Sequence, residues 1–433
     1  MASHAPSPAV WTAADAERWL LSLERAGMRF GLERMRSLMA TLGAPNDAFR
    51  AIHVVGTNGK SSTVRMIDAI LAGHGVRTGA YLSPHLVSFA ERIRVGGADL
   101  TAEQLAVAVA RAQRATEVVD GALDPDDGVT QFEALTAAAY AQLAAAQVEV
   151  AIVEAGLGGL WDATNVLDAE IVVLTNVDVE HTRWLGSTVA EIARQKLGVL
   201  AAGGTLVLGA GLHPDVEAQA RDAAERQCAR IVRAPGQPDE LEPGVALLAR
   251  GAFQRRNFAV ACAAARAYLG ALDGAAVRTA ALSTPVPGRF EVLPDGDGGA
   301  RGELVLDGAH NVAGIAALVA SLPEFLAGRP LVAVVSVLDD KDARAMLADL
   351  LALCAGVVFT ASANPRALAA GVLAGLAGEP PAHVAARVED DPRRALEVAR
   401  DLAGPGGVVL ATGSIYLVAD LKRPAGAPPG STL

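Results

Sequence analysis

The feature that most constrains the fold of this chain is the segment IHVVGTNGKSST at residues 52–63. An apolar run ends in a loop bracketed by Gly56 and Gly59, and Lys60 with two serines leads into a helix-like segment at 64–71. Backbone N–H groups and the positive end of a helix dipole favour a polyphosphate at such a place. Lys60 can reach the terminal phosphates, and a hydroxyl after it can hold Mg²⁺. The segment therefore predicts an ATP site, and the strand before it and the helix after it count against a chance surface turn.

Strand-like and helix-like segments alternate along most of the chain, which predicts mostly parallel sheets covered on both faces. The first series of strand-like runs is 51–55, 78–82, 148–153, 171–175 and 205–208. The alanine-rich helical segments between them are 102–115, 132–146 and 189–200. The second series of strand-like runs is 303–306, 331–335, 356–360 and 407–412. We predict an α/β protein with a P-loop parallel-sheet ATPase domain and a smaller C-terminal Rossmann-like α/β domain.

A stretch rich in proline and glycine, residues 284–301, separates the two series and is typical of a domain boundary. We therefore expect an N-terminal ATP-binding domain over 1–285, a linker over 286–301 and a C-terminal domain over 302–433. Ligands of open α/β sheets bind at the carboxyl ends of strands. Two such domains that face each other predict a ligand cleft between them.

The composition narrows the class of partner. The net charge is −11 and no basic run appears, so nucleic-acid binding is not expected. No run is long and apolar enough to span a bilayer, and residues 1–10 lack the pattern of a secretion signal. The cysteines Cys228, Cys262 and Cys354 are far apart and predict buried free thiols in a reducing compartment. We expect a monomeric cytoplasmic protein that binds small molecules.

Polar side chains follow three strands of the first series. Ser83, in SPHL, could complete the shell of a phosphate-bound Mg²⁺, although a turn before proline is the alternative. Glu154 ends an apolar strand before a glycine cluster, which suits a Mg²⁺-binding carboxylate better than a solvated acid. His181 follows the next strand and could be a metal ligand, a phosphate contact or a structural histidine.

Two further groups allow more than one interpretation. Lys196 lies in a predicted helix, where a lysine is usually a solvated surface charge. Asp307, His310 and Asn311 cluster at the start of the second series and could bind an amino acid or ATP. Alternatively they cap the helix predicted over 312–322.

Together these pieces resemble the folylpolyglutamate synthase/dihydrofolate synthase family of the Mur ligase superfamily, from residue 31 to residue 416. The matching motifs are GTNGKSS (56–62), SPHL (83–86), ERIRVGG (91–97), FEALTAAAY (132–140), EAGLGG with DATN (154–165), HTRWLG (181–186), PGRFE (287–291), DGAHN (307–311), DDKD (339–342) and GSIY (413–416). The order and spacing of these motifs are specific to the folate branch.

The resemblance implies a role for each matching position. The residues expected to bind ATP are Asn58, Gly59, Lys60, Ser61, Asn257, Arg289 and Asp307. The residues expected to surround Mg²⁺ are Ser61, Ser83, Glu154 and His181. The catalytic side chains expected are Lys60, His181 and Lys196, and Lys196 matches a lysine that is carbamylated in the family. The residues expected to hold the pteroate moiety are Thr130, Gln131, Phe132, Glu133, Trp161, Asp162 and Ala163. The residues expected on the glutamate side are His310 and Ser414.

The sequence departs from the family pattern at two places. Ser61 stands where the family often has glycine, which leaves open whether Ser61 or Ser62 meets the metal. Leu160 stands where the family has arginine, so the loop loses a cation. Trp161, the next residue, could stack on a pterin ring.

The resemblance implies an ATP-dependent amide ligase that adds L-glutamate to dihydropteroate, to folates or to both, through an acyl phosphate. A Mur-like ligase that acts on another carboxylate acceptor is the first alternative. A P-loop ATPase or nucleotide-binding regulator is an alternative of another class. It would leave Lys196 and the cluster at 307–311 without a role.

Overall fold

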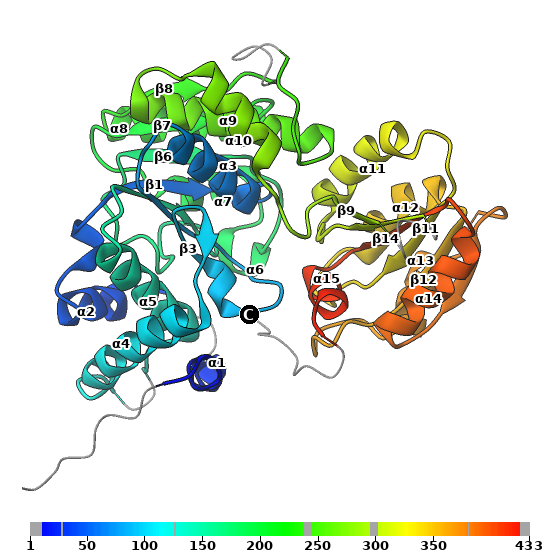
Figure 1. Cartoon of the computed structure of the whole chain (residues 1–433), viewed down its shortest axis with the longest axis horizontal. Coiled ribbons are helices and arrows are strands. Elements are labelled where there is room, and N and C mark those ends of the chain that lie inside the picture. The colour runs from blue at the N-terminus through cyan, green and yellow to red at the C-terminus, as the bar shows by residue number, and fades with distance from the viewer. Residues whose placement is uncertain are drawn as a thin grey trace, which may run out of the picture.

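The computed structural model describes residues 11–26, 29–124, 127–237, 244–294, 302–379 and 381–424. Its strands form two sheets, and helices cover both faces of each. Figure 1 shows the two layered units side by side. The predicted α/β class with two mostly parallel sheets is therefore confirmed. No helix in these described ranges combines the length and the hydropathy needed to cross a membrane.

The strands of the first sheet are β1 (Arg50–Val55), β2 (Thr78–Tyr81), β3 (Ile93–Val95), β4 (Ala98–Asp99), β5 (Val150–Glu154), β6 (Ile171–Leu174), β7 (Thr205–Leu208) and β8 (Arg230–Arg233). Their order is β4-β3-β2-β5-β1-β6-β7-β8. The central strand β1 is parallel to β5 and β6, and β3 and β4 form an antiparallel edge. Because β1 and β5 are covered on both faces, all of their residues except Arg50 are buried and most are apolar.

The helices of the first unit are α1 (Ala13–Ser22), α2 (Glu33–Thr41), α3 (Lys60–Gly73), α4 (Ala102–Asp120), α5 (Gln131–Ala145), α6 (Thr182–Leu185), α7 (Val189–Leu197), α8 (Pro214–Arg226), α9 (Ala252–Leu269) and α10 (Gly274–Ser283). Its short 3-10 helices are η1 (Leu23–Ala26), η2 (Pro45–Asp47) and η3 (Phe89–Arg92). Side chains of a strand alternate between faces. Ile52 and Val54 of β1 therefore pack with α3 and α9, while Ala51 and Val55 pack with α4, α5 and α7.

The strands of the second sheet are β9 (Glu291–Pro294), β10 (Glu303–Leu306), β11 (Leu331–Val335), β12 (Gly356–Phe359), β13 (Ala385–Val388) and β14 (Val408–Thr412). Their order is β13-β12-β11-β14-β10-β9, with β9 antiparallel to β10. The helices of this unit are α11 (Val312–Leu326), α12 (Ala343–Leu353), α13 (Ala370–Ala377), α14 (Pro392–Ala403) and α15 (Ile415–Lys422). Leu86, from the first unit, packs into the apolar cluster under α14 and α15 and joins the two units.

Every strand predicted from the sequence is present, with small shifts at the ends. Strands β3, β4, β8, β9 and β13 were not predicted from the sequence. These strands are short, and β4, β8 and β13 are exposed along much of their length. They therefore lack the apolar run that marks a buried strand.

Two expectations need correction. The linker predicted over 286–301 is wrong for Glu291–Pro294, which form β9 and pair with β10. Residues 295–301 of that linker lie outside the described residues. The expectation of three buried thiols is wrong for Cys228, which is exposed, whereas Cys262 and Cys354 are buried. Cys228 lies in the turn after α8, where its φ is 51°, and no packed element covers it.

Candidate active site

The phosphate loop lies between β1 and α3, as the sequence predicts. Gly59 has a φ of 82°, and a Cβ there would lie 2.4 Å from Asn257 Oδ1 on α9. Only glycine fits this close approach without strain. The loop is held in place because Asn58 N donates to Asn176 Oδ1 at 2.8 Å. Lys60 Nζ donates to Thr57 O at 3.1 Å and so folds back over the loop.

Three of the four predicted metal residues meet beside this loop. Ser61 Oγ donates to Glu154 Oε1 at 2.9 Å, and Ser83 N donates to Glu154 Oε2 at 3.1 Å. Burial raises the pKa of Glu154, while the Lys60 ammonium and these hydrogen bonds oppose that rise. Ser62, the alternative to Ser61, is 2% exposed. The hydroxyl that faces Glu154 is therefore that of Ser61.

The fourth predicted metal residue stands apart from the other three. His181 precedes α6 with a φ of 52°, and its Nε2 lies 3.9 Å from Glu180 Oε1. Burial lowers the pKa of His181 to about 4, so its ring is neutral at physiological pH and could act as a ligand. In the part of the chain that the structure describes, His181 makes no hydrogen bond to Ser61, Ser83 or Glu154.

The Ser61–Glu154–Ser83 group has the chemistry of a hard divalent-cation site. Hydroxyl and carboxylate oxygens are the ligands that Mg²⁺ prefers, and it usually keeps water and substrate phosphates as well. A cation would also stabilise the buried carboxylate of Glu154. Within the described ranges no group of three or more His, Cys, Asp or Glu side chains could hold a metal. Phosphates and water would therefore have to supply ligands beyond the few that the protein offers.

Lys196 lies on α7, next to the phosphate loop, and is 4% exposed. Its Nζ donates to Gly56 O at 2.7 Å. Burial, and then the charge of Lys60, lower the pKa of Lys196 to about 7. The interpretation of Lys196 as a solvated surface lysine is therefore wrong. A buried lysine with this pKa is partly neutral at physiological pH, and the neutral amine is nucleophilic.

The second unit presents the turn at residues 307–311 to the phosphate loop. Asp307 accepts hydrogen bonds from Phe290 N and Ala309 N, both at 2.8 Å. Burial raises the pKa of Asp307, and the guanidinium of Arg289 opposes that rise. A Cβ on Gly308 would lie 2.5 Å from Arg289 Nη1, so Arg289 lies across this turn. The structure thus brings together two predicted nucleotide contacts, Arg289 and Asp307.

Two of the polar contacts that join the units lie beside this site, and neither was predicted from the sequence. Asn58 and Asn311 exchange a pair of amide hydrogen bonds at 3.2 and 3.1 Å. Asn311 Oδ1 also accepts from Gly314 N at 2.7 Å, so the predicted helix cap is confirmed.

The second contact is an ion cluster around Glu180. Its Oε1 accepts from Lys341 Nζ at 3.1 Å and lies 3.2 Å from His310 Nε2. Burial acts to raise the pKa of Glu180, but His310 and Lys341 outweigh burial and hold that pKa well below its usual range. A signal existed in the sequence, since Glu180 precedes His181 and Lys341 stands alone in an acidic run.

Most polar side chains of the predicted pteroate segment are already engaged inside the protein. Thr130 and Glu133 form the capping box of α5, and Glu133 also accepts from Arg34 Nε at 3.0 Å. Gln131 Nε2 donates to Leu20 O at 3.0 Å. Phe132 is half-buried, and its ring would contact a Cβ placed on Gly156. Of these four residues, Phe132 offers an apolar face to a ligand.

The second part of that segment, residues 156–165, we call the acceptor loop. Trp161 is 46% exposed, whereas Asp162 and Ala163 are buried. Leu160 N donates to Gln195 O at 2.8 Å, and its side chain packs on Gly198. Leu160 therefore anchors the loop on α7 and adds no charge.

The predicted glutamate-side residues belong to the second unit. Ser414 is buried and caps α15 by accepting from Tyr416 N at 3.2 Å. His310 lies in the ion cluster with Glu180, and its Nδ1 is 2.9 Å from Gly308 O. His310 is therefore the one of the two that reaches the boundary between the units.

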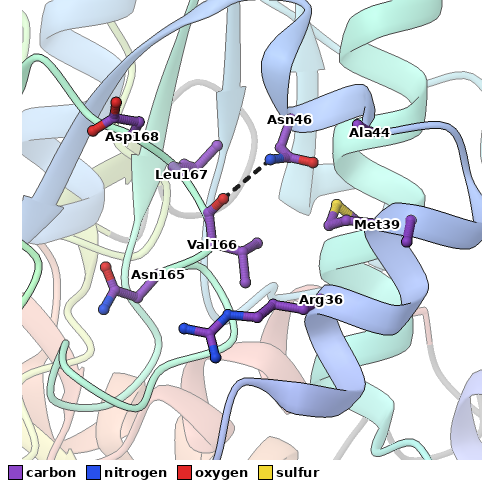
Figure 2. Close-up of a pocket in the computed structure, with 9 residues that line it drawn as sticks. Arg36, Met39, Ala44, Asn46, Asn165, Val166, Leu167 and Asp168 are labelled. Atoms are coloured by element: carbon purple, nitrogen blue, oxygen red, sulfur yellow. Dashed lines mark hydrogen bonds between the residues drawn. The ribbon is translucent and has the colours of Figure 1, made fainter.

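A pocket of about 450 Å³ lies on the outer side of the acceptor loop, between α2 and residues 165–168. Figure 2 shows Asn46 directed toward this segment, where its Nδ2 donates to Val166 O at 3.1 Å. Of the residues predicted to act in the site, none lines this pocket.

Comparison with known proteins agrees with this geometry. Residues 288–415 match the family described as Mur ligase, glutamate ligase domain. The chain is 34% identical over 405 residues to a dihydrofolate synthase/folylpolyglutamate synthase of Mycobacterium tuberculosis, which covers 86% of this chain and 82% of that protein. It is 29% identical to the protein of the same name from Bacillus subtilis, over 94% of this chain and 98% of that protein.

Solved structures extend the likeness to the whole fold. The Mycobacterium tuberculosis folylpolyglutamate synthase complexed with ADP gives a TM-score of 0.86 at 32% identity, over 95% of this chain and 98% of that chain. A bifunctional folylpolyglutamate synthase/dihydrofolate synthase from Yersinia pestis, complexed with AMPPNP and Mn ion, gives a TM-score of 0.82 at 28% identity. The match covers 97% of this chain and 98% of that chain. Fold and site together define an ATP-dependent ligase of the Mur type. The chain belongs to the folylpolyglutamate synthase/dihydrofolate synthase family.

Proposed function

We propose that this chain uses ATP to join L-glutamate to the carboxylate of dihydropteroate, of a reduced folate, or of both. The observation that carries the proposal is the phosphate loop opposite the turn at 307–311, with Asn58 and Asn311 bonded across the boundary. This arrangement supports a nucleotide between the two units. The names of the relatives support the choice of acceptor and amino acid.

The proposed nucleotide contacts come from both units. Those for the phosphates are Asn58, Gly59, Lys60 and Ser61. Those for the rest of the nucleotide are Asn257, Arg289 and Asp307. We assign Mg²⁺ to Ser61, Ser83, Glu154 and His181, with Ser61 preferred over Ser62 because its hydroxyl faces Glu154. When bound, the cation would supply charge neutralisation at the transferring phosphoryl group.

The proposed reaction has two steps. An oxygen of the acceptor carboxylate attacks the γ-phosphorus of ATP, the bond to the β-γ bridging oxygen breaks, and ADP leaves with that electron pair. The amine of glutamate then attacks the acyl carbon, loses a proton and expels phosphate. Lys60 donates hydrogen bonds to the phosphate oxygens as charge develops on them. The Glu180–Lys341 and Asn58–Asn311 contacts hold the units together and so help to keep water from the acyl phosphate.

We also propose that Lys196 is carbamylated. The reaction joins its neutral amine to CO₂ and releases a proton, which leaves a carboxylate at the end of the side chain. With a pKa of about 7 in place of 10.5, roughly a thousand times more of the amine is neutral at pH 7. The product would be an anion beside Lys60 and the phosphates, where it could orient the cation's water.

We further propose that the chain acts as a monomer, because one chain supplies both sides of the site. We place it in the cytoplasm, where the buried thiols of Cys262 and Cys354 stay reduced.

The test is ADP release that depends on glutamate, measured with dihydropteroate and with a reduced folate. The proposal expects release with at least one of them and none without glutamate. A different carboxylate acceptor is the second candidate, because Leu160 and Trp161 give the acceptor loop a different surface from that of the family. A cell-wall precursor acid serves as the comparison acceptor. ADP release with that acid, but not with dihydropteroate or the reduced folate, would overturn the folate assignment.

A further inference from the structure

A buried chain of hydrogen bonds ties the central strand β1 to the acceptor loop. His53 lies on β1, is fully buried, and its Nε2 is 2.8 Å from Thr164 Oγ1. Thr164 Oγ1 in turn donates to Asp162 Oδ1. A hydroxyl has one proton, and that proton goes to the carboxylate. Thr164 must therefore accept from His53, so Nε2 carries the proton of the imidazole ring.

Asp162 extends this chain of hydrogen bonds into the acceptor loop. Its Oδ1 also accepts from Thr164 N at 3.1 Å, and its Oδ2 accepts from Leu157 N at 2.7 Å. Leu157 lies between the glycines that follow the proposed metal ligand Glu154. Tyr140 Oη donates to Thr164 O at 3.0 Å and steadies the same point. One buried carboxylate therefore closes the acceptor loop on itself.

The rest of the loop is pinned to α7. Leu160 N donates to Gln195 O at 2.8 Å, and a Cβ on Gly159 would lie 2.6 Å from Lys196 O. The contact with α7 fixes one side of the loop, and the contact with His53 fixes the other. His53 lies three residues before Gly56, at the start of the phosphate loop. It therefore forms a direct polar link between the strand that carries the phosphate loop and the loop that faces the acceptor.

An apolar side chain at position 53 would avoid the free-energy cost of burying an unsatisfied polar nitrogen. His53 faces the same side of β1 as Ala51 and Val55, which belong to an apolar cluster. Its Nδ1 is buried without a hydrogen-bond partner in the described part of the chain. An unsatisfied buried nitrogen is destabilising. The histidine thus contributes something other than packing at this position, and the hydrogen bond to Thr164 is a contact that an apolar residue cannot make.

We propose that His53 is a positioning residue that sets the distance between the acceptor loop and the phosphate loop, acting through Thr164 and Asp162. The inference rests on the proposed function, because the acceptor carboxylate must meet the γ-phosphate in line. Small misplacement of reacting groups lowers rates strongly, by roughly a hundredfold for an error of about 1 Å.

The experiment compares variants that remove the donor with variants that keep it. His53→Leu and Thr164→Val remove the link with little change in volume. His53→Gln and Thr164→Ser keep a donor and a hydroxyl at these places. We expect the first pair to lower kcat/KM for the preferred pteroate acceptor by roughly ten- to a hundredfold. The KM for ATP should stay within about twofold, because the phosphate loop is untouched, and the second pair should recover most of the loss.

The double variant His53→Leu/Thr164→Val should be no worse than the more impaired single variant, since both break one chain of bonds. The proposal would be overturned if the loss of kcat/KM in the double variant equalled the product of the two single losses. It would also be overturned if the KM for ATP rose as kcat/KM fell, or if His53→Gln recovered no activity. If His53→Leu does not fold, Thr164→Val against Thr164→Ser decides the question. Absence of glutamate-dependent ADP release from the wild-type chain would instead overturn the proposed function.

Discussion

Replacing Lys196 by methionine should stabilise the protein at neutral pH while it removes ligase activity. The folded state holds the pKa of Lys196 at about 7, against an ordinary value of 10.5 that the unfolded chain retains. Between these two values the unfolded chain binds more protons than the folded one, so stability rises with pH through this window. At about 1.4 kcal/mol for each pKa unit, burying the lysine costs about 5 kcal/mol below pH 7.

Methionine matches the length of lysine without its charge, so it removes this cost at low pH. The substitution also removes the hydrogen bond from Nζ to Gly56 O. Leaving that buried carbonyl unpartnered costs about 1–3 kcal/mol. We therefore expect Lys196→Met to be about 2–4 kcal/mol more stable than the wild type at pH 6.5. The advantage should shrink as the pH rises and reverse between about pH 8 and pH 10.

The assay is urea unfolding of both proteins at pH 6.5, 8 and 9.5 in buffers free of CO₂, which keeps the wild-type lysine unmodified. Lys422→Met is the control, since Lys422 pairs with Glu291 near the surface and should give no stabilisation. ADP release, measured separately in buffer that contains bicarbonate, should be lost in Lys196→Met and kept in Lys422→Met. A Lys196→Met protein that is less stable than the wild type at pH 6.5, or an advantage that does not shrink with pH, would refute the reasoning.

Three further predictions concern the same boundary. Lys60→Ala should abolish ADP release with an unchanged urea midpoint, and full activity in this variant would contradict the phosphate-loop assignment. Glu154→Gln should raise the Mg²⁺ concentration needed for half-maximal ADP release at least about tenfold, because it removes the one carboxylate of the cation site. An unchanged Mg²⁺ titration would rule that role out. Lys341→Met leaves Glu180 without its lysine partner and should lower the free energy of unfolding by about 3 kcal/mol. Urea unfolding of the double variant Lys341→Met/Glu180→Gln should recover most of this loss, and no recovery would show that the ion pair is not its cause.

The fold could be predicted where the signal is local. The apolar runs of β1, β5 and β6 mark strands buried on both faces, and Thr130 and Thr188 mark the starts of α5 and α7 through their capping boxes. The edge strands could not be predicted from the sequence. Strands such as β8 and β13 are half-exposed and short, and their pairing with a neighbour stabilises them more than their own sequence does.

The candidate site divides in the same way. Gly59 and Lys60 can be read from the strand–loop–helix segment, and Glu154 from its place at the end of β5. The burial of Lys196 could not be predicted from the sequence, because a lysine on a helix becomes buried only when another element covers it. Its lowered pKa follows from that cover and from the charge of Lys60.

The two-sheet architecture, the phosphate loop and the family can be predicted without a structure, because glycine positions, apolar periodicity and motif order are properties of the linear chain. Which distant side chains meet depends on how the folded chain packs. Asn58 and Asn311 are 253 positions apart, Glu180 and Lys341 are 161 apart, and His53 and Thr164 are 111 apart. Each of these contacts depends on how sheets and units pack, and hydrogen bonds act over only about 3 Å. A sequence pattern carries no such distance, so these links appear only once the chain is folded.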